Sequence, residues 1–184
     1  MTILGAIFAG GAGRRFGSDK ALAGIDGRAM IEHVAGRLAR QCDALVVVGR
    51  EWPGLATAAD IPTPGLGPLG ALAGALHHAR THGHALVLTS GCDLPDLPGD
   101  LAARLAPAPA VVRGQPLLGL WEASLAPDLA AYLEAGGDRA MRSWIARSNA
   151  RTVALDRTPT NINTREELAR FLEHIALRSD RNTP

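Results

Sequence analysis

Residues Gly5 to Leu22 read GAIFAGGAGRRFGSDKAL, and this stretch decides the fold. Its first part belongs to an apolar run, Thr2 to Ala9, which has the length of a strand and stops at a cluster of glycines. A buried strand of a parallel sheet passes into a loop in this way. We therefore expect a parallel sheet whose first strand ends at a glycine-rich loop.

This loop has the composition of an anion-binding site. Its glycines permit positive φ and leave no Cβ in the way, so several backbone N–H groups can point at one anion. These glycines are Gly10, Gly11, Gly13 and Gly17. Arg14, Arg15 and Lys20 add three positive charges, which would repel one another around an empty loop. The loop predicts a phosphate-binding site, and a tight turn without a ligand is the alternative.

Two familiar phosphate-binding motifs do not fit the loop. A P-loop ends in Gly-Lys-Ser/Thr, whereas Lys20 is followed by Ala21. A dinucleotide-binding fingerprint requires Gly-x-Gly-x-x-Gly, but the last two glycines of this loop are spaced one residue too far apart. The pattern Ala-Gly-Gly-x-x-x-Arg-x-Gly-x-x-Lys, from Ala9 to Lys20, instead resembles the signature of nucleotidyltransferases that activate a phosphate with a nucleoside triphosphate.

The composition limits the classes of function. The formal net charge is +1 and the aromatic residues are three Phe, three Trp and one Tyr, so no basic or base-stacking surface for nucleic acid is expected. No apolar run approaches the roughly 20 residues that span a bilayer. Cys42 and Cys92 lie far apart, as is typical of reduced thiols in a cytoplasmic protein. We expect a cytoplasmic protein that binds no nucleic acid and no membrane, with one domain at 1–177 and a disordered tail at 178–184.

The remaining sequence alternates strands and helices. Predicted strands cover residues 2–9, 44–48, 85–89, 110–112 and 117–121, the last two antiparallel, and a final strand begins at Val153. Predicted helices cover residues 30–40, 69–81, 101–105, 125–134 and 140–147, and a last helix follows a capping box of Thr164 and Glu167. By the right-handed crossover rule, this order predicts an α/β fold with a mostly parallel central sheet.

Two acidic residues are expected at the carboxyl edge of this sheet, where open α/β proteins bind ligands. Asp93 follows the strand at 85–89 and serves either as a metal ligand or as a cap of its own turn. Asp60 lies in a loop rich in Pro and Gly, residues 52–67, and loops of this length are usually functional.

Polar residues in the last third of the chain are weaker candidates. Asn161 and Asn163 precede the last helix, and they either shape a turn or contact phosphate or Mg²⁺. Arg139 either faces solvent or binds an anionic substrate.

Four sequence blocks stand in order along the chain. They are Phe8-Ala-Gly-Gly11 with Arg14, Arg15, Gly17 and Lys20; Gly67-Pro-Leu69; Cys92-Asp-Leu-Pro95; and Asn161-Ile-Asn-Thr164 with Glu166-Glu-Leu168. Together they resemble the molybdenum cofactor guanylyltransferases, over Ile3 to Leu172. The resemblance implies a three-layer, Rossmann-like nucleotidyltransferase fold. It also implies transfer of GMP from GTP to the terminal phosphate of molybdopterin or Mo-molybdopterin, with Mg²⁺ as cofactor and release of pyrophosphate. Molybdoenzymes or their chaperones are implied as further partners.

The resemblance also implies roles for single residues. The nucleotide contacts fall on Phe8, Ala9, Gly10, Gly11 and Asp60. Lys20 matches the lysine that binds the triphosphate, and Asp93 matches the aspartate that holds Mg²⁺. Gly49 departs from the family, because an Asn that helps to hold the nucleotide often stands there.

Further residues are candidates for catalysis and for the second substrate. Arg15 is a candidate catalytic residue beside Lys20 and Asp93. The candidates for contacting the pterin substrate are Arg14, Arg139, Asn161 and Asn163.

The implied chemistry needs no protein nucleophile, because a phosphate oxygen attacks the α-phosphorus once the two are aligned and their charge is neutralised. A close alternative is a nucleotidyltransferase that uses CTP or a sugar phosphate. An alternative from another class is a non-catalytic GTP-binding protein that carries molybdopterin.

Overall fold

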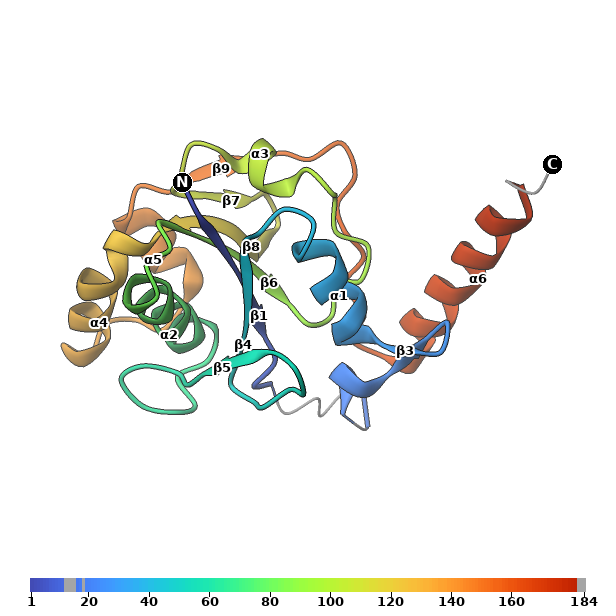
Figure 1. Ribbon diagram of the computed structural model, residues 1–184, viewed down its shortest axis with the longest axis horizontal. Helices are drawn as coiled ribbons and strands as arrows, with labels where there is room; N and C mark the ends of the chain where they lie inside the picture. The colour runs from blue at the N-terminus through green and yellow to red at the C-terminus, as the bar shows by residue number, and fades with distance from the viewer. Residues whose placement is uncertain (12–15, 18, 182–184) are drawn as a thin grey trace.

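The computed structural model describes residues 1–11, 16, 17 and 19–181 (Figure 1). The strands are β1 Ile3–Phe8, β2 Gly24–Ile25, β3 Arg28–Ala29, β4 Ala44–Val48, β5 Ala56–Ala58, β6 Leu86–Gly91, β7 Ala110–Val112, β8 Gln115–Glu122 and β9 Arg151–Val153. The helices are α1 Met30–Leu38, α2 Pro68–Thr81, α3 Leu101–Leu105, α4 Ala126–Glu134, α5 Met141–Arg147 and α6 Arg165–Arg181, with 3₁₀ turns η1 Lys20–Leu22 and η2 Ala123–Leu125. The predicted helices from 30–40 to 140–147, and the predicted strands from 2–9 to 117–121, are confirmed to within two residues at each end.

Seven strands form one sheet in the order β5-β4-β1-β6-β8-β7-β9. The central strand β1 lies between its parallel neighbours β4 and β6, and β5 extends the parallel part. Strand β8 runs antiparallel to β6 and β7, while β9 runs parallel to β7. The predicted fold class, a mostly parallel α/β sheet, is confirmed.

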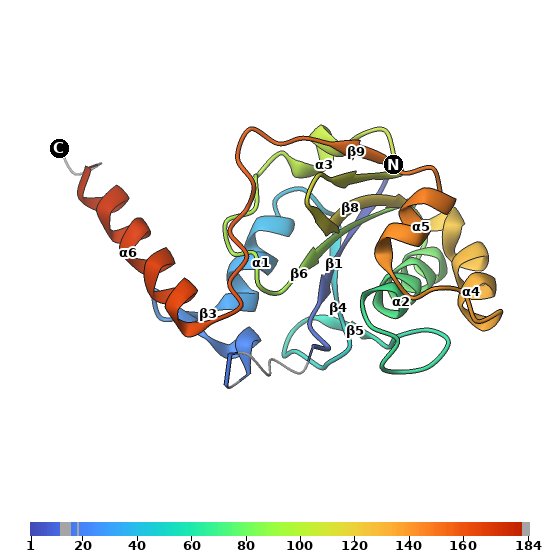
Figure 2. The same cartoon turned by 180° about the vertical axis from the view of Figure 1, so that it is seen from behind.

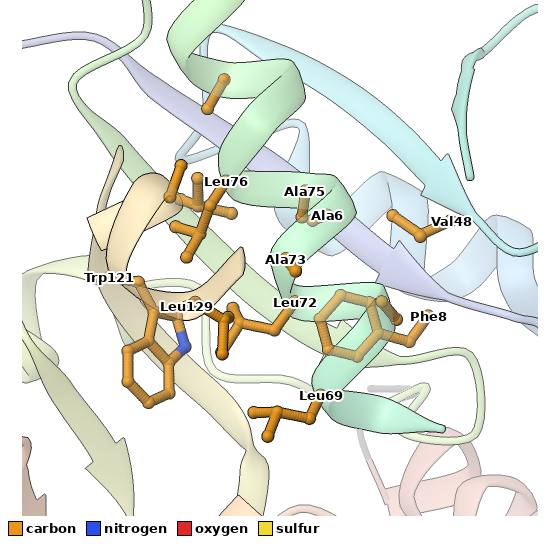
Figure 3. Packing of buried hydrophobic residues seen from close by; sticks show 14 of the residues in the cluster. Ala6, Phe8, Val48, Leu69, Leu72, Ala73, Ala75, Leu76, Trp121 and Leu129 are labelled. Atoms are coloured by element: carbon orange, nitrogen blue, oxygen red, sulfur yellow. The ribbon is translucent and has the colours of Figure 1, made fainter. Parts of the chain in front are cut away.

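Helices cover both faces of the sheet, with α1 and α3 on one face and α2, α4 and α5 on the other (Figures 1 and 2). Because side chains alternate along a strand, Leu4, Ala6 and Phe8 of β1 pack toward α2, while Ile7 packs toward α1. Figure 3 shows α2 packed on the sheet near Trp121, which is fully buried. This packing gives a rigid base for the loops at the carboxyl ends of the strands.

Besides the two cores on the faces of the sheet, a smaller core joins the short hairpin of β2 and β3 to α6. Helix α6 projects from the body of the molecule (Figures 1 and 2). The buried residues of this smaller core are Phe16, Ile25, Met30, Ile162 and Phe171. This core therefore holds together the end of the glycine loop and the segment before α6. Among the described residues, no helix is both long and apolar enough to cross a membrane.

Three local features differ from the sequence-based expectations. Strand β5 lies within the predicted loop 52–67, because its Ala-rich sequence carries no strand pattern and pairing with β4 creates the strand. The final strand ends at Val153 instead of beginning there, because residues 151–153 pair with β7. Helix α6 continues to Arg181, beyond residue 177 where the disordered tail was expected to begin, and no Gly or Pro interrupts it.

Candidate active site

A cavity of about 950 Å³ opens at the carboxyl ends of β1, β4 and β6. Of the candidate residues, Phe8, Ala9, Gly10, Gly11, Lys20, Asp60, Asp93 and Asn163 line it. Gly67 and Pro68, at the N-terminus of α2, also border it. The positive end of the helix dipole and the ammonium of Lys20 both favour a bound anion there.

Lys20, Asp93 and Asn163 meet in this cavity. The ammonium of Lys20 donates to Asp93 Oδ2 at 2.6 Å and to Asn163 Oδ1 at 3.0 Å. The side chains of Lys20 and Asp93 are only 18% and 14% exposed, so their attraction is weakly screened by water. The structure thus joins residues that are 73 and 143 positions apart in the chain.

Local structure fixes the positions of Asp93 and Asn163. The predicted capping box is confirmed: Thr164 Oγ1 accepts from the N–H of Glu167, whose carboxylate accepts from the N–H groups of Asn163 and Thr164. The N–H of Ile162 donates to the carbonyl of Asp93 at 3.0 Å, which ties the two segments together. A Cβ at Gly91 would overlap Asp93 Oδ1, so any larger residue there would displace this carboxylate.

The oxygen atoms of Asp93 and Asn163 suit a hard divalent cation such as Mg²⁺. Within the described residues, no group of three or more His, Cys, Asp or Glu side chains is arranged to hold a metal. A metal at Asp93 would take its other ligands from substrate phosphates and water, as Mg²⁺ commonly does when it is bound together with a nucleotide.

Gly49, where the resemblance led us to expect an Asn, follows β4 and packs against Gly10. Its φ is +87°, and a Cβ on it would lie 2.7 Å from Gly10 Cα and 2.9 Å from Gly10 N. A side chain at this position would be strained and would also displace Gly10. The close contact between the two backbones therefore requires glycine here.

Asp60 reaches the cavity because its segment packs directly on α2. A Cβ at Gly74 would overlap the carbonyl oxygen of Ala59, and a Cβ at Gly70 would lie 3.3 Å from Asp60 Cβ. The carboxylate of Asp60 accepts from the N–H of Gly65 at 3.1 Å. The sequence signal for this contact is the spacing of two glycines, four residues apart, on one face of a helix.

Two of the described candidate residues do not line the cavity. Arg139 is exposed in the segment between α4 and α5, and Asn161 is exposed before α6. Neither lines the cavity, so the structure gives no support to their role as substrate contacts. Arg14 and Arg15 lie outside the described residues.

The residues that line the cavity without having been assigned to the site include Asp19, Arg50 and Cys92. The guanidinium of Arg50 donates to Asp19 Oδ1 at 2.8 Å, and this bond lowers the pKa of Asp19 and raises that of Arg50. Burial raises the pKa of the Cys92 thiol to about 11, so at neutral pH it is protonated and a poor nucleophile.

A cavity at the carboxyl edge of the sheet that holds a partly buried lysine beside a carboxylate, and whose thiol stays protonated, is suited to moving a nucleotidyl group from one phosphate to another. The fold and the site therefore define a nucleotidyltransferase. The chain belongs to the MobA-like NTP transferase family, because the model of the "MobA-like NTP transferase domain" matches residues 5–153.

Similar proteins agree with this membership. The chain is 37% identical to a protein of Cereibacter sphaeroides named molybdenum cofactor guanylyltransferase, over 92% of this chain and 95% of that one. It is 35% identical to a protein of the same name from Acidiphilium cryptum, over 88% and 90% of the two chains. A solved structure, the molybdopterin-guanine dinucleotide biosynthesis protein A of Archaeoglobus fulgidus, shares the fold with a TM-score of 0.76 at 21% identity, over 94% of this chain and 98% of that one. The predicted resemblance, fold and enzyme class are confirmed.

Proposed function

We propose that the protein transfers GMP from GTP to the terminal phosphate of molybdopterin or Mo-molybdopterin and releases pyrophosphate. A phosphate oxygen of the pterin forms a bond to the α-phosphorus of GTP, and the bond from that phosphorus to the bridging oxygen of pyrophosphate breaks. The observation that carries this proposal is the placement of Lys20 between Asp93 and Asn163 in a cavity at the carboxyl edge of the sheet. The relatives named molybdenum cofactor guanylyltransferase support a guanylyl donor and an acceptor that belongs to the molybdenum cofactor.

The residues of the chain have separate tasks in this reaction. The backbone of Phe8 to Gly11 and the carboxylate of Asp60 bind the guanosine part of GTP. Lys20 neutralises the triphosphate, and the burial of its ion pair makes that charge more effective than it would be in water. Asp93 would hold Mg²⁺, with Asn163 beside it. When bound, Mg²⁺ neutralises phosphate oxygens and so makes the α-phosphorus easier to attack.

Residues 1–177 would form one catalytic domain in the cytoplasm, where Cys42 and Cys92 would stay free thiols. Arg14 and Arg15 are proposed to contact the phosphates of the two substrates. The product would pass to molybdoenzymes or to their chaperones.

One assay tests the function. Purified protein is incubated with molybdopterin, Mg²⁺ and GTP, CTP or ATP in turn, and released pyrophosphate and the product mass are measured. Of the three nucleotides, we expect only GTP to give pyrophosphate and a guanylylated pterin. A cytidylylated product would favour the CTP-using alternative, and GTP binding without any pyrophosphate would favour the carrier.

A further inference from the structure

Asp19 and Arg50 form a two-pronged ion pair at the mouth of the cavity. Arg50 Nη1 donates to Asp19 Oδ1 at 2.8 Å, and Arg50 Nη2 lies 2.7 Å from Asp19 Oδ2. Asp19 Oδ1 also accepts from the N–H of Ala21 at 3.1 Å, so Asp19 is the N-cap of the turn η1. Both side chains line the cavity. The pair therefore holds the turn that begins with Lys20.

Asp19 and Lys20 are neighbours in the chain, but their side chains bind partners on opposite sides of the central strand of the sheet. Strand β1 lies between β4 and β6. Asp19 is bound to Arg50, two residues after the end of β4, while Lys20 is bound to Asp93, two residues after the end of β6. Each of these two neighbouring residues is thus held by an ion pair, and the two ion pairs lie on opposite sides of β1.

The orientation of Arg50 depends mainly on Asp19. Its Nε is buried and has no hydrogen-bond partner among the described residues. Its guanidinium also lies over the ring of Trp52, 5.8 Å from the centroid, near the outer limit of a cation–π contact. A planar guanidinium that binds a carboxylate with two parallel bonds fixes direction as well as distance.

We propose that Arg50 is a positioning residue for nucleotidyl transfer, which acts through Asp19 to hold Lys20 toward Asp93 and the triphosphate. This inference rests on the proposed function. Lysine is a flexible side chain with a point charge, so its place in the cavity depends on how firmly its backbone is held. Without Arg50, the 19–20 segment loses its anchor at β4, and the remaining pair of Lys20 and Asp93 is held less firmly.

Lys20 is the only lysine in the 184 residues, which allows a direct test of its position. Protein labelled with ¹⁵N and ¹³C in lysine has a single side-chain ammonium to observe by NMR. In Arg50→Met and Asp19→Asn, we expect that signal to move toward the position of a free lysine, without added metal or nucleotide. Asp19→Asn keeps the oxygen that caps Ala21 and removes the charge. Arg104→Met is the control, because it breaks an ion pair with Asp100 and Asp156 outside the cavity and should leave the signal in place.

The affinity for GTP gives a second measure of how Arg50 and Asp19 affect Lys20. We expect Arg50→Met and Asp19→Asn each to weaken GTP binding about tenfold, the scale of losing one well-placed charged hydrogen bond. The double variant should be no weaker than either single variant, because both act on one contact. Arg50→Lys keeps the positive charge but cannot form the bidentate contact with Asp19, so it should bind GTP as poorly as Arg50→Met.

Three results would overturn the inference: an unmoved Lys20 signal in Arg50→Met, additive losses in the double variant, or normal GTP binding by Arg50→Lys. Additive losses would mean that Arg50 acts on the nucleotide independently of Asp19. Failure of the unmodified protein to bind GTP would instead overturn the proposed function, and the NMR experiment would still decide whether Arg50 positions Lys20.

Discussion

The ammonium of Lys20 lies 2.6 Å from Asp93 Oδ2, so the lysine proposed to bind the triphosphate neutralises the carboxylate proposed to bind the metal. The two proposed roles require this pair to separate when GTP and a divalent cation bind. Lys20 then turns to the phosphates, and Asp93 becomes free for the metal. Metal and nucleotide should therefore bind more tightly together than either does alone.

Replacement of Lys20 by Met keeps the length of the side chain and removes its charge. In the absence of nucleotide, we expect this variant to bind Mn²⁺ about tenfold more tightly, because Asp93 loses a competing cation. Its turnover should fall at least about 100-fold, as when one preorganised charge-stabilising group is removed. Calorimetry with Mn²⁺ alone checks the first result, and Mn²⁺ affinity equal to that of the unmodified protein would show that Lys20 does not compete.

Asp93→Asn separates metal binding from nucleotide binding. The amide keeps the size of the carboxylate, so the free energy of unfolding should change little, while Mg²⁺ loses its charged oxygen ligand. We expect GTP to bind without metal, Mg²⁺-dependent transfer to be lost, and Mn²⁺ to restore part of it because it binds nitrogen and oxygen donors more tightly. Asp156→Asn removes the same charge from a side chain that is 94% exposed and should keep full turnover. Normal turnover of Asp93→Asn at ordinary Mg²⁺ would refute the metal assignment.

Replacement by Ala should change the stability of the fold in opposite directions at Gly74 and Gly36, although both lie within helices. Gly36 in α1 has open space where a Cβ would stand, so Gly36→Ala should stabilise the fold by about 0.5–1 kcal/mol through helix propensity. Gly74→Ala should destabilise it by about 1–3 kcal/mol, because the new Cβ overlaps the carbonyl oxygen of Ala59.

Denaturant unfolding of the two alanine variants measures this difference. Since Ala59 adjoins Asp60, Gly74→Ala should also weaken GTP binding, whereas Gly36→Ala should not. Equal gains in stability would mean that the 59–60 segment does not pack on α2 as described.

His78 makes stability depend on pH. Burial lowers its pKa below the ordinary 6.5, and repulsion by the neighbouring His82, whose ring stacks on it at 4.0 Å, adds to this. Near pH 6.5, the folded protein therefore binds fewer protons than the unfolded chain. The free energy of unfolding falls as the pH drops through about 6.5. We expect unfolding free energies measured from about pH 7.5 to about pH 5 to decline less in His78→Gln. The same decline in both proteins would contradict this origin of the pH dependence.

The sequence by itself determined the class of fold and most helices and strands. These features depend on local patterns: the apolar run of β1 stops at Gly10, and the capping box of Thr164 and Glu167 marks the start of α6. The family resemblance added the roles of Asp93 and Asn163, because no local pattern separates them from residues that only shape a turn.

Only the tertiary structure decided which of these residues act together. Strand order brings the tips of β4, β1 and β6 side by side, and it alone places Arg50 on Asp19 and Lys20 on Asp93. Strand β5 likewise exists because β4 offers an edge to pair with, not because of its own Ala-rich sequence. Contacts between residues 31 to 143 positions apart depend on the packing of the whole chain, and local propensity carries no information about them.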